Sequence, residues 1–166
     1  MAGNMFLKIE EPAVTGESAD SQHSDDIQVL SWSHSFNQPT SPTRSSAGSG
    51  TVEQANHSEF SFTKYTDSAT DDLLKLCWQG NQIGKTSFFA YRADGDNEPV
   101  LYLKIEMEDC IVSNVSIGGG TGDIPTETIS MNYGKVTYTY KPQSKEEGTA
   151  GGDEPVSHDL VAQKVE

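Results

Sequence analysis

Apolar and polar side chains alternate along most of this chain, and this two-residue period predicts β-strands. The clearest runs are residues 5–9, 27–36, 57–64, 86–92, 100–107, 111–117 and 128–140. The first half of 100–107 is apolar at successive positions, so we expect it to be buried on both faces. Strands that are covered on both sides favour a barrel or a sandwich of antiparallel strands.

Two of these runs change phase part of the way along. In 27–36 the apolar set changes parity between Val29 and Leu30, and in 128–140 it changes at Gly134. At Val29–Leu30 we expect a bulge or a residue that is buried on both faces. At Gly134 we expect a bulge or a bend, because glycine inside a strand often marks such a distortion.

A single segment has helical spacing. Ser68 and Asp71 form a capping pattern at its start, and Gly80 is a natural stop at its end. One apolar face is formed by Ala69, Leu73, Leu76 and Cys77. The sequence therefore predicts one mainly β domain over residues 1–166, an antiparallel β-barrel or sandwich with this helix packed on its outside.

Three stretches do not fit either pattern. Residues 10–26 hold six acids and no Lys or Arg, which predicts a solvated or poorly ordered loop. Residues 37–50 are rich in Ser, Thr, Pro and Gly and cannot bury themselves, so this long loop is expected to be functional or disordered. Residues 141–152 are interpreted as a polar linker before a short terminal strand within 156–165.

The charge balance narrows the classes of partner. Lys and Arg total 11 against 25 Asp and Glu, which gives a net charge of −14. Such a chain is a poor ligand for nucleic acid or for an anionic membrane surface. No apolar run approaches the ~20 residues of a membrane-spanning helix, and the first residues lack the basic and apolar regions of a signal peptide. We therefore expect synthesis in the cytoplasm, no membrane insertion, and any export by a signal-free route.

Hydrophobic residues make up only 34% of the chain. Such a modest core suggests that part of the surface is loop or is buried against another subunit. Two cysteines, Cys77 and Cys110, do not make a disulfide scaffold or a zinc site, and both are expected to behave as small buried hydrophobes.

Two glycine-rich segments could suggest phosphate binding. Residues 80–86 have three residues between their glycines where a P-loop has four, and here a helix precedes the segment and a strand follows it. Residues 118–122 lie between strands and beside Asp123, so a hairpin turn is expected there.

The histidines do not suggest a reaction either. In the run 157–159 (Ser-His-Asp) adjacent side chains point to opposite sides of a strand and cannot form a relay. His23 has Asp25 and Asp26 nearby but no second cluster of metal ligands. We expect no enzymatic activity, no metal and no cofactor.

Residues 35–54, 60–80 and 136–140 resemble the haemolysin-coregulated protein family, the tube proteins of the bacterial type VI secretion system. The most specific parts are residues 41–44 and 62–80. The resemblance implies a β-barrel with one helix that assembles as a homohexameric ring with a wide lumen. It also implies that stacked rings form a tube inside a contractile sheath, with a spike protein at the tip and effector proteins carried in the lumen, and that the protein is secreted without a signal peptide.

In that family the extended loop lies at the contact between rings, and the matching positions here are residues 40–50. The resemblance thus implies the stacking residues Thr40, Ser41, Pro42, Thr43, Arg44, Ser45 and Ser46. We expect Arg44 to pair with a carboxylate on the next ring or to remain a solvated surface residue. Strand parity offers Ser113, Asn114 and Ser116 as lumen-facing residues, with the outer face as the alternative.

Two other classes of function are possible from the residues alone. A monomeric β-barrel that binds a small ligand would have a mass near 18.0 kDa, whereas a ring of six copies would have about 108 kDa. An enzyme would need a cluster of acid, base or nucleophile that the sequence does not supply.

Overall fold

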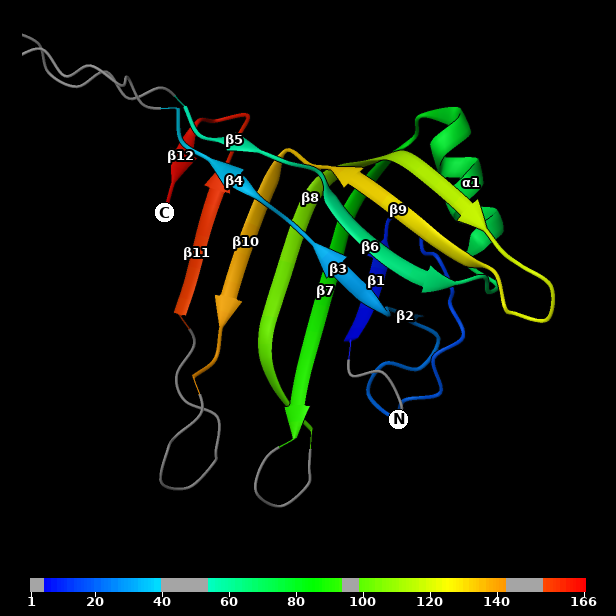
Figure 1. Ribbon diagram of the computed structural model, residues 1–166. Coiled ribbons are helices and arrows are strands. Elements are labelled where there is room, and N and C mark those ends of the chain that lie inside the picture. Colours follow the sequence, from blue (N-terminus) through cyan, green and yellow to red (C-terminus); the bar gives the residue numbers. More distant parts are fainter. Residues whose placement is uncertain (1–4, 40–53, 94–98, 143–153) are drawn as a thin grey trace, which may run out of the picture.

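The computed structural model describes residues 5–39, 54–93, 99–142 and 154–166. These residues form a mainly β fold with a single helix (Figure 1). In chain order the elements are β1 (Met5–Glu10), β2 (Ile27–Gln28), β3 (Ser31–Ser33), β4 (Phe36–Asn37), β5 (Asn56–His57), β6 (Phe60–Tyr65), α1 (Thr70–Gln79), β7 (Gln82–Ala93), β8 (Pro99–Gly118), β9 (Thr126–Asn132), β10 (Lys135–Tyr140), β11 (Glu154–Asp159) and β12 (Lys164–Val165).

The long strand β8 organises the main sheet. One path of paired strands runs β12-β11-β10-β8-β7-β1-β2, and a second branch leads from β8 through β9 and β6 to β3. The sequence predicted two strands at 100–107 and 111–117, and this was wrong, because β8 is continuous over twenty residues. Asp109 adopts a left-handed conformation with φ 56°, so β8 bends there without a break in the strand.

Two strands follow one another along the same edge of β8. β10 pairs with residues 103–108 and β9 with residues 111–118. The single strand predicted over 128–140 was wrong, because it divides into β9 and β10; the break falls at Gly134, where a bulge or bend was expected, beside the bend of β8. A Cβ atom at Gly134 would lie 3.3 Å from the Cβ of Asp109, which explains why the chain has glycine at this close approach.

The segment 27–36 also differs from the single strand that was predicted. It divides into β2, which pairs with β1, and β3, which pairs with β6, followed by β4. The amide of Val29 donates to the carbonyl of Met5 (3.0 Å), and the amide of Leu30 donates to Thr63 (2.8 Å). The phase change therefore marks a corner where the chain passes from one wall of the sheet to the other. The two walls together form an incomplete barrel.

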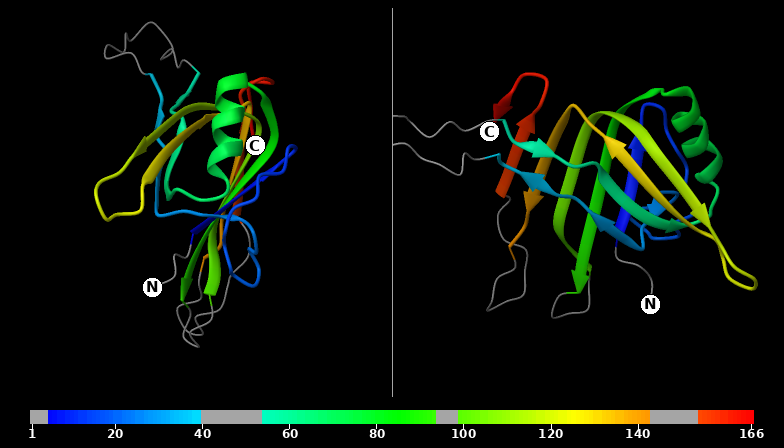
Figure 2. Two further views of the ribbon diagram at one scale, coloured as in Figure 1. Left: turned by 90° about the vertical axis from the view of Figure 1, so that its right-hand side faces the viewer. Right: turned by 45° about the horizontal axis from the view of Figure 1, so that its top comes forward.

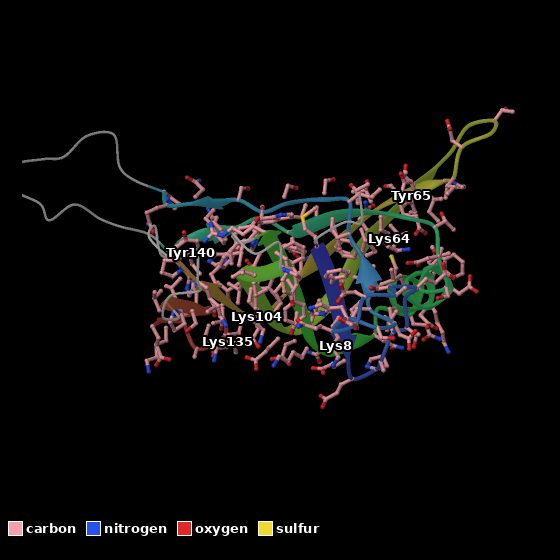
Figure 3. All side chains as sticks on the ribbon, turned by 90° about the horizontal axis from the view of Figure 1, so that it is seen from below. Lys8, Lys64, Tyr65, Lys104, Lys135 and Tyr140 are labelled. Atoms are coloured by element: carbon pink, nitrogen blue, oxygen red, sulfur yellow. The ribbon has the colours of Figure 1, made fainter. Side chains whose placement is uncertain are left out.

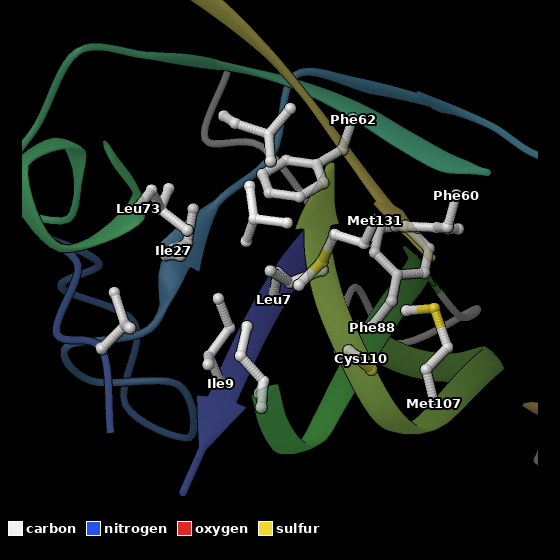
Figure 4. Packing of buried hydrophobic residues seen from close by; sticks show 14 of the residues in the cluster. Leu7, Ile9, Ile27, Phe60, Phe62, Leu73, Phe88, Met107, Cys110 and Met131 are labelled. Atoms are coloured by element: carbon white, nitrogen blue, oxygen red, sulfur yellow. The ribbon is translucent and has the colours of Figure 1, made fainter. Parts of the chain in front are cut away.

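The core lies between these two walls (Figure 4). Phe88 of β7 is fully buried and contacts both Trp32 of β3 and Phe60 of β6, with ring centroids 5.2 and 5.5 Å apart. Aromatic contacts across the interior thus join the two walls. The fully buried side chains around them include Leu7, Ile9, Ile27, Phe62, Ile105, Met107 and Ile129.

Helix α1 packs at one end of the barrel (Figure 2). Its start differs from the predicted Ser68 cap. The carboxylate of Asp67 accepts the amide of Ala69 (3.0 Å), while the hydroxyl of Ser68 donates to the carbonyl of Thr15. At the other end Gly80 has φ 62° and closes the helix with its amide on the carbonyl of Cys77. No helix among the described residues is long and apolar enough to cross a membrane.

Residues 10–26 form the loop that was expected, with most of their side chains exposed, but this loop is compact and parts of it are buried. Backbone hydrogen bonds close the segment on itself, with Gly16 donating to Asp25 and Asp25 donating to Ser18. His23 is buried and stacks on Phe6 at a centroid distance of 4.7 Å. The acidic composition hid this packing because a compact loop has no apolar period to detect.

β4 and β5 pair with each other in a small separate sheet, which we call the arm; residues 40–53 between them, with the predicted stacking loop, lie outside the described residues. The arm lies beside β10 and the C-terminal hairpin of β11 and β12 (Figure 1). The hairpin replaces the single terminal strand that was predicted in 156–165. Nearly all of the linker expected at 141–152 falls outside the described residues.

Candidate assembly surfaces

One outward surface of the barrel carries mainly short uncharged side chains, with Tyr65 at its edge. The strand registers place Ser31 opposite Thr63, Ser61 opposite Ser130, and Thr128 opposite Ser116. Directly opposed residues lie on the same face of a sheet. We call this surface the hydroxyl face; it comprises Ser31, Ser33, Ser61, Thr63, Asn114, Ser116, Thr128 and Ser130.

Side chains on the hydroxyl face bond mainly to one another. The hydroxyls of Ser61 and Ser130 are 2.8 Å apart, and the amide of Asn114 donates to Ser116 at 3.1 Å. The alternate residues of the same strands, such as Phe62 and Ile129, point into the core. A surface without charge is unusual for a chain with net charge −14, so this face is suited to contact partners without selecting for their charge.

The other wall has a surface of different chemistry. We call it the lysine–glutamate face, and strand pairing among β1, β7, β8 and β10 defines it as Lys8, Glu10, Lys85, Lys104, Glu106, Glu108 and Lys135. Figure 3 shows Lys8, Lys104 and Lys135 on the side of the molecule away from β6. Four of the 11 basic residues gather here with three acids, so this face is close to neutral.

Glu106 lies at the centre of the lysine–glutamate face. Its carboxylate is 3.0 Å from the Nζ of Lys104 and 3.2 Å from the Nζ of Lys85. Partial burial raises the pKa of this carboxyl, but the hydrogen bonds and charges of the two lysines outweigh it and lower the pKa overall. Glu106 therefore remains charged at neutral pH, and these partly exposed pairs contribute little to stability.

A second ionic cluster is buried where α1 meets the sheet. Lys64 of β6 and Glu127 of β9 have no exposed side-chain surface, and the Nζ of Lys64 lies 2.5 Å from Glu127 Oε2. The same ammonium donates to Asp67 (2.7 Å), whose carboxylate begins the helix. The hydroxyl of Thr70 also donates to Glu127 (2.9 Å). This cluster therefore positions the helix against the barrel.

Three histidines and two tyrosines form a continuous hydrogen-bonded chain between the arm and the sheet. His34 Nδ1 lies 2.5 Å from the hydroxyl of Tyr138, and His34 Nε2 lies 2.7 Å from the hydroxyl of Tyr133. The same Tyr133 hydroxyl lies 2.7 Å from His57 Nδ1, and His57 Nε2 lies 2.7 Å from His158 Nδ1. We call this set the histidine–tyrosine chain.

The side chains that could have suggested catalysis or metal binding make other contacts. His158 bonds to His57, while Asp159 accepts the amides of Val161 and Ala162, so residues 157–159 form no relay. His23 bonds to Asp26 and Tyr91, and no group of three or more potential metal ligands occurs among the described residues. Burial raises the pKa of Cys110 to about 11, so its thiol is a poor nucleophile.

The predicted site residues lie in three different places. The stacking residues 40–46 are outside the described residues. Ala69, Leu73 and Leu76 are buried in the core, and Cys77 is partly buried against it. Asn114 and Ser116 lie on the hydroxyl face; Ser113 is at a register shift of β8, and its hydroxyl donates to the carbonyl of Ser130 (3.1 Å).

Sequence reasoning missed both the full hydroxyl face and the histidine–tyrosine chain. Their members come from segments as far apart as 33 and 130 or 34 and 158, and only the strand registers bring them together. The recurring Ser and Thr at alternate strand positions was the one available signal for the hydroxyl face.

Comparison with known proteins gives a consistent result. A family model described as "Type VI secretion system effector, Hcp" matches residues 6–140. Protein hcp1 of Pseudomonas aeruginosa is 37% identical over 153 residues, which cover 92% of this chain and 91% of that protein.

Solved structures agree with this match. A structure described as a type six secretion system protein has a TM-score of 0.88 and 27% identity, covering 99% of this chain and 100% of its own. Hcp1 from Salmonella typhimurium has a TM-score of 0.79 and 28% identity over the full length of both chains. The chain therefore belongs to the Hcp family of the type VI secretion system.

Proposed function

We propose that this chain is the structural subunit of the type VI inner tube. Six copies close into a ring, and rings stack into a tube that a contractile sheath expels with a spike protein at its tip. Effector proteins travel in the lumen, and the subunit itself catalyses no reaction. It reaches the outside with the tube and without a signal peptide.

The observation that carries this proposal is the pair of apolar surfaces at opposite ends of the sheet. Val161 and Val165 of the C-terminal hairpin are 79% and 66% exposed. At the far end, near β2 and the β8–β9 turn, Leu30 and Ile124 are 39% and 63% exposed. Two different apolar patches on opposite ends suit a head-to-tail contact between copies, which closes into a ring.

The runner-up function, a monomeric barrel with a small ligand, has less support. A barrel of this kind would hold its ligand between the two walls of the sheet. That space is filled by Phe60, Phe62 and Phe88. Small-molecule sites are instead concave and open to a ligand.

We further propose that residues 40–46 contact the next ring in the stack. The strands on either side of residues 40–53, β4 and β5, form a sheet separate from the main one, which supports a contact role for the segment between them. Arg44 brings a positive charge to an acidic protein, and we propose that it pairs with a carboxylate of the neighbouring ring.

Stacking should depend on salt. Six copies of a chain with net charge −14 carry −84, so rings repel one another at long range. Salt at 0.1 M screens this repulsion to about 10 Å. Electron microscopy across a salt series is expected to show separate rings in dilute buffer and tubes at high salt and high protein concentration. Tubes that form best at the lowest ionic strength would contradict the proposal.

We also propose that the hydroxyl face lines the lumen and that the lysine–glutamate face points outward. An uncharged surface of short side chains lets cargo of either charge pass, whereas a lining with the average charge of this chain would repel acidic proteins. Asn114 and Ser116, which strand parity offered as lumenal, belong to this face.

The two faces can be located with gold labels on single cysteines. In a Cys77→Ser background, Cys110 is buried and unreactive, so Ser116→Cys and Lys104→Cys each carry one label. Averaged images of rings are expected to show gold at the central hole for Ser116→Cys and at the periphery for Lys104→Cys. The reverse pattern would refute the assignment of the faces while leaving the ring itself intact.

A further inference from the structure

We propose that the histidine–tyrosine chain is an acid-sensitive latch, which holds the arm on β10 and β11 when its histidines are neutral and releases it when they are protonated. His34 lies just before β4 and His57 lies in β5 of the arm, whereas Tyr138 and His158 belong to β10 and β11. The latch is a property of one subunit and goes beyond the proposed tube function.

When its histidines are neutral, the histidine–tyrosine chain has one proton for each of its four hydrogen bonds. Tyr138 can donate its hydroxyl proton to His34 Nδ1, and His34 can donate from Nε2 to Tyr133. Tyr133 can then donate to His57 Nδ1, and His57 can donate from Nε2 to His158 Nδ1. A neutral imidazole has one donor and one acceptor, so each of the four contacts holds one proton and all are satisfied.

One added proton is tolerated, but a second one is not. A protonated imidazole donates from both nitrogens. Protonated His57 still donates to Tyr133 and His158, whereas protonation of His158 as well would bring two N–H groups face to face across 2.7 Å. Protonation of both His34 and His57 would direct two donors at Tyr133 and place two positive charges on either side of it.

The surroundings offer no compensating charge. In the described part of the chain no carboxylate bonds to His34, His57 or His158. The other groups that face the chain are the rings of Phe36 and Phe60, the backbone at Ser58, the thiol of Cys110 and, across the hairpin, Val165. The charged residues of β11 are Glu154, which pairs with Tyr140 in the strand register four positions before His158, and Asp159, which caps the hairpin turn. Lys164 of β12 and Glu166 after it pair with each other.

The direction of the pH effect follows from burial. Burial, the charge of His57 and the backbone of Ser58 together place the pKa of His34 at about 4, and burial and His158 lower the pKa of His57. A released histidine has a pKa near 6.5. The released arm therefore binds more protons than the held arm, so the latch is fully engaged above pH 6.5 and weakens as the pH falls toward about 4.

Hydrogen–deuterium exchange of the full-length protein measures the latch directly. Below pH 6.5 each titrating histidine shifts the opening equilibrium by up to about tenfold per pH unit. After correction for the intrinsic pH dependence of exchange, peptides from 35–39 and 54–59 are expected to lose roughly ten- to thirtyfold protection between pH 7.5 and pH 5.0. Peptides from β1 and β7 should stay unchanged. Equal protection of the arm at both pH values in the wild-type protein would overturn the latch.

Variants test whether these histidines carry the response. Glutamine keeps hydrogen-bonding groups but does not titrate in this range, so the double variant His34→Gln/His57→Gln should abolish the response to acid, whatever its baseline protection. His23→Gln is the matched control, because His23 bonds to Asp26 and Tyr91 away from the arm, and it should keep the full response. A His34→Gln/His57→Gln protein that still releases its arm at pH 5.0 would sink the proposal.

Light scattering at the same two pH values separates this result from the proposed function. Rings that persist while the arm stays protected refute the latch alone. A monomer whose arm opens with acid refutes the ring and retains the latch.

Discussion

Replacing Lys64 by Met is expected to lower the free energy of unfolding by about 3–5 kcal/mol, because it leaves a buried carboxylate without its cation. Glu127 is fully buried, and its second oxygen, Oε1, has no hydrogen-bond partner among the described residues. Its charge therefore depends on Lys64 and on the hydroxyl of Thr70. Thermal unfolding at fixed protein concentration should show a melting temperature lower by roughly 10 °C.

Two further variants test the cause of this loss. Lys104→Met makes the same replacement on a partly exposed strand position that pairs with Glu106, and it should change stability by less than about 1 kcal/mol. In the double variant Lys64→Met/Glu127→Leu both charges are removed, so most of the stability should return. Equal melting temperatures for Lys64→Met and Lys104→Met would show that the buried cluster does not stabilise the fold.

Replacing Phe88 by Ala is expected to cost about 3–5 kcal/mol, since it removes a fully buried ring from the centre of the core. Phe88 joins β7 to Trp32 and Phe60 on the opposite wall. The cavity left by the Ala side chain would therefore remove contacts between the two walls of the sheet. Denaturant unfolding monitored by tryptophan fluorescence measures the loss.

The next residue provides a matched control. Phe89 points to the opposite face of β7, where it is partly exposed beside His23 and Lys104. Phe89→Ala should therefore cost clearly less than Phe88→Ala. The same loss for both variants would mean that the interior between the two walls is not the stabilising core.

The parts of the fold that depend on local patterns could be predicted from the sequence. Alternating runs give strands at β1, β6 and β7, and i, i+4 spacing places Leu73 on the buried face of α1. Gly134 marks the break between β9 and β10, where a Cβ atom would lie in tight contact with Asp109, 3.3 Å from its Cβ.

The remaining features depend on contacts between distant segments. The continuity of β8 rests on a left-handed Asp109, a residue that usually signals a turn. The Ser68 cap failed because the hydroxyl of Ser68 donates to the distant carbonyl of Thr15, and no side chain in the described part of the protein caps the first turn of the helix. Period alone cannot show which strands meet, so it could not place the hydroxyl face or the histidine–tyrosine chain.

The mass of the purified protein in solution tests the central claim, that this chain works as a building block of closed rings, most directly. Light scattering coupled to size-exclusion chromatography is expected to give about 108 kDa, the mass of six 18.0 kDa chains. A single species of 18.0 kDa at every salt and protein concentration would contradict it.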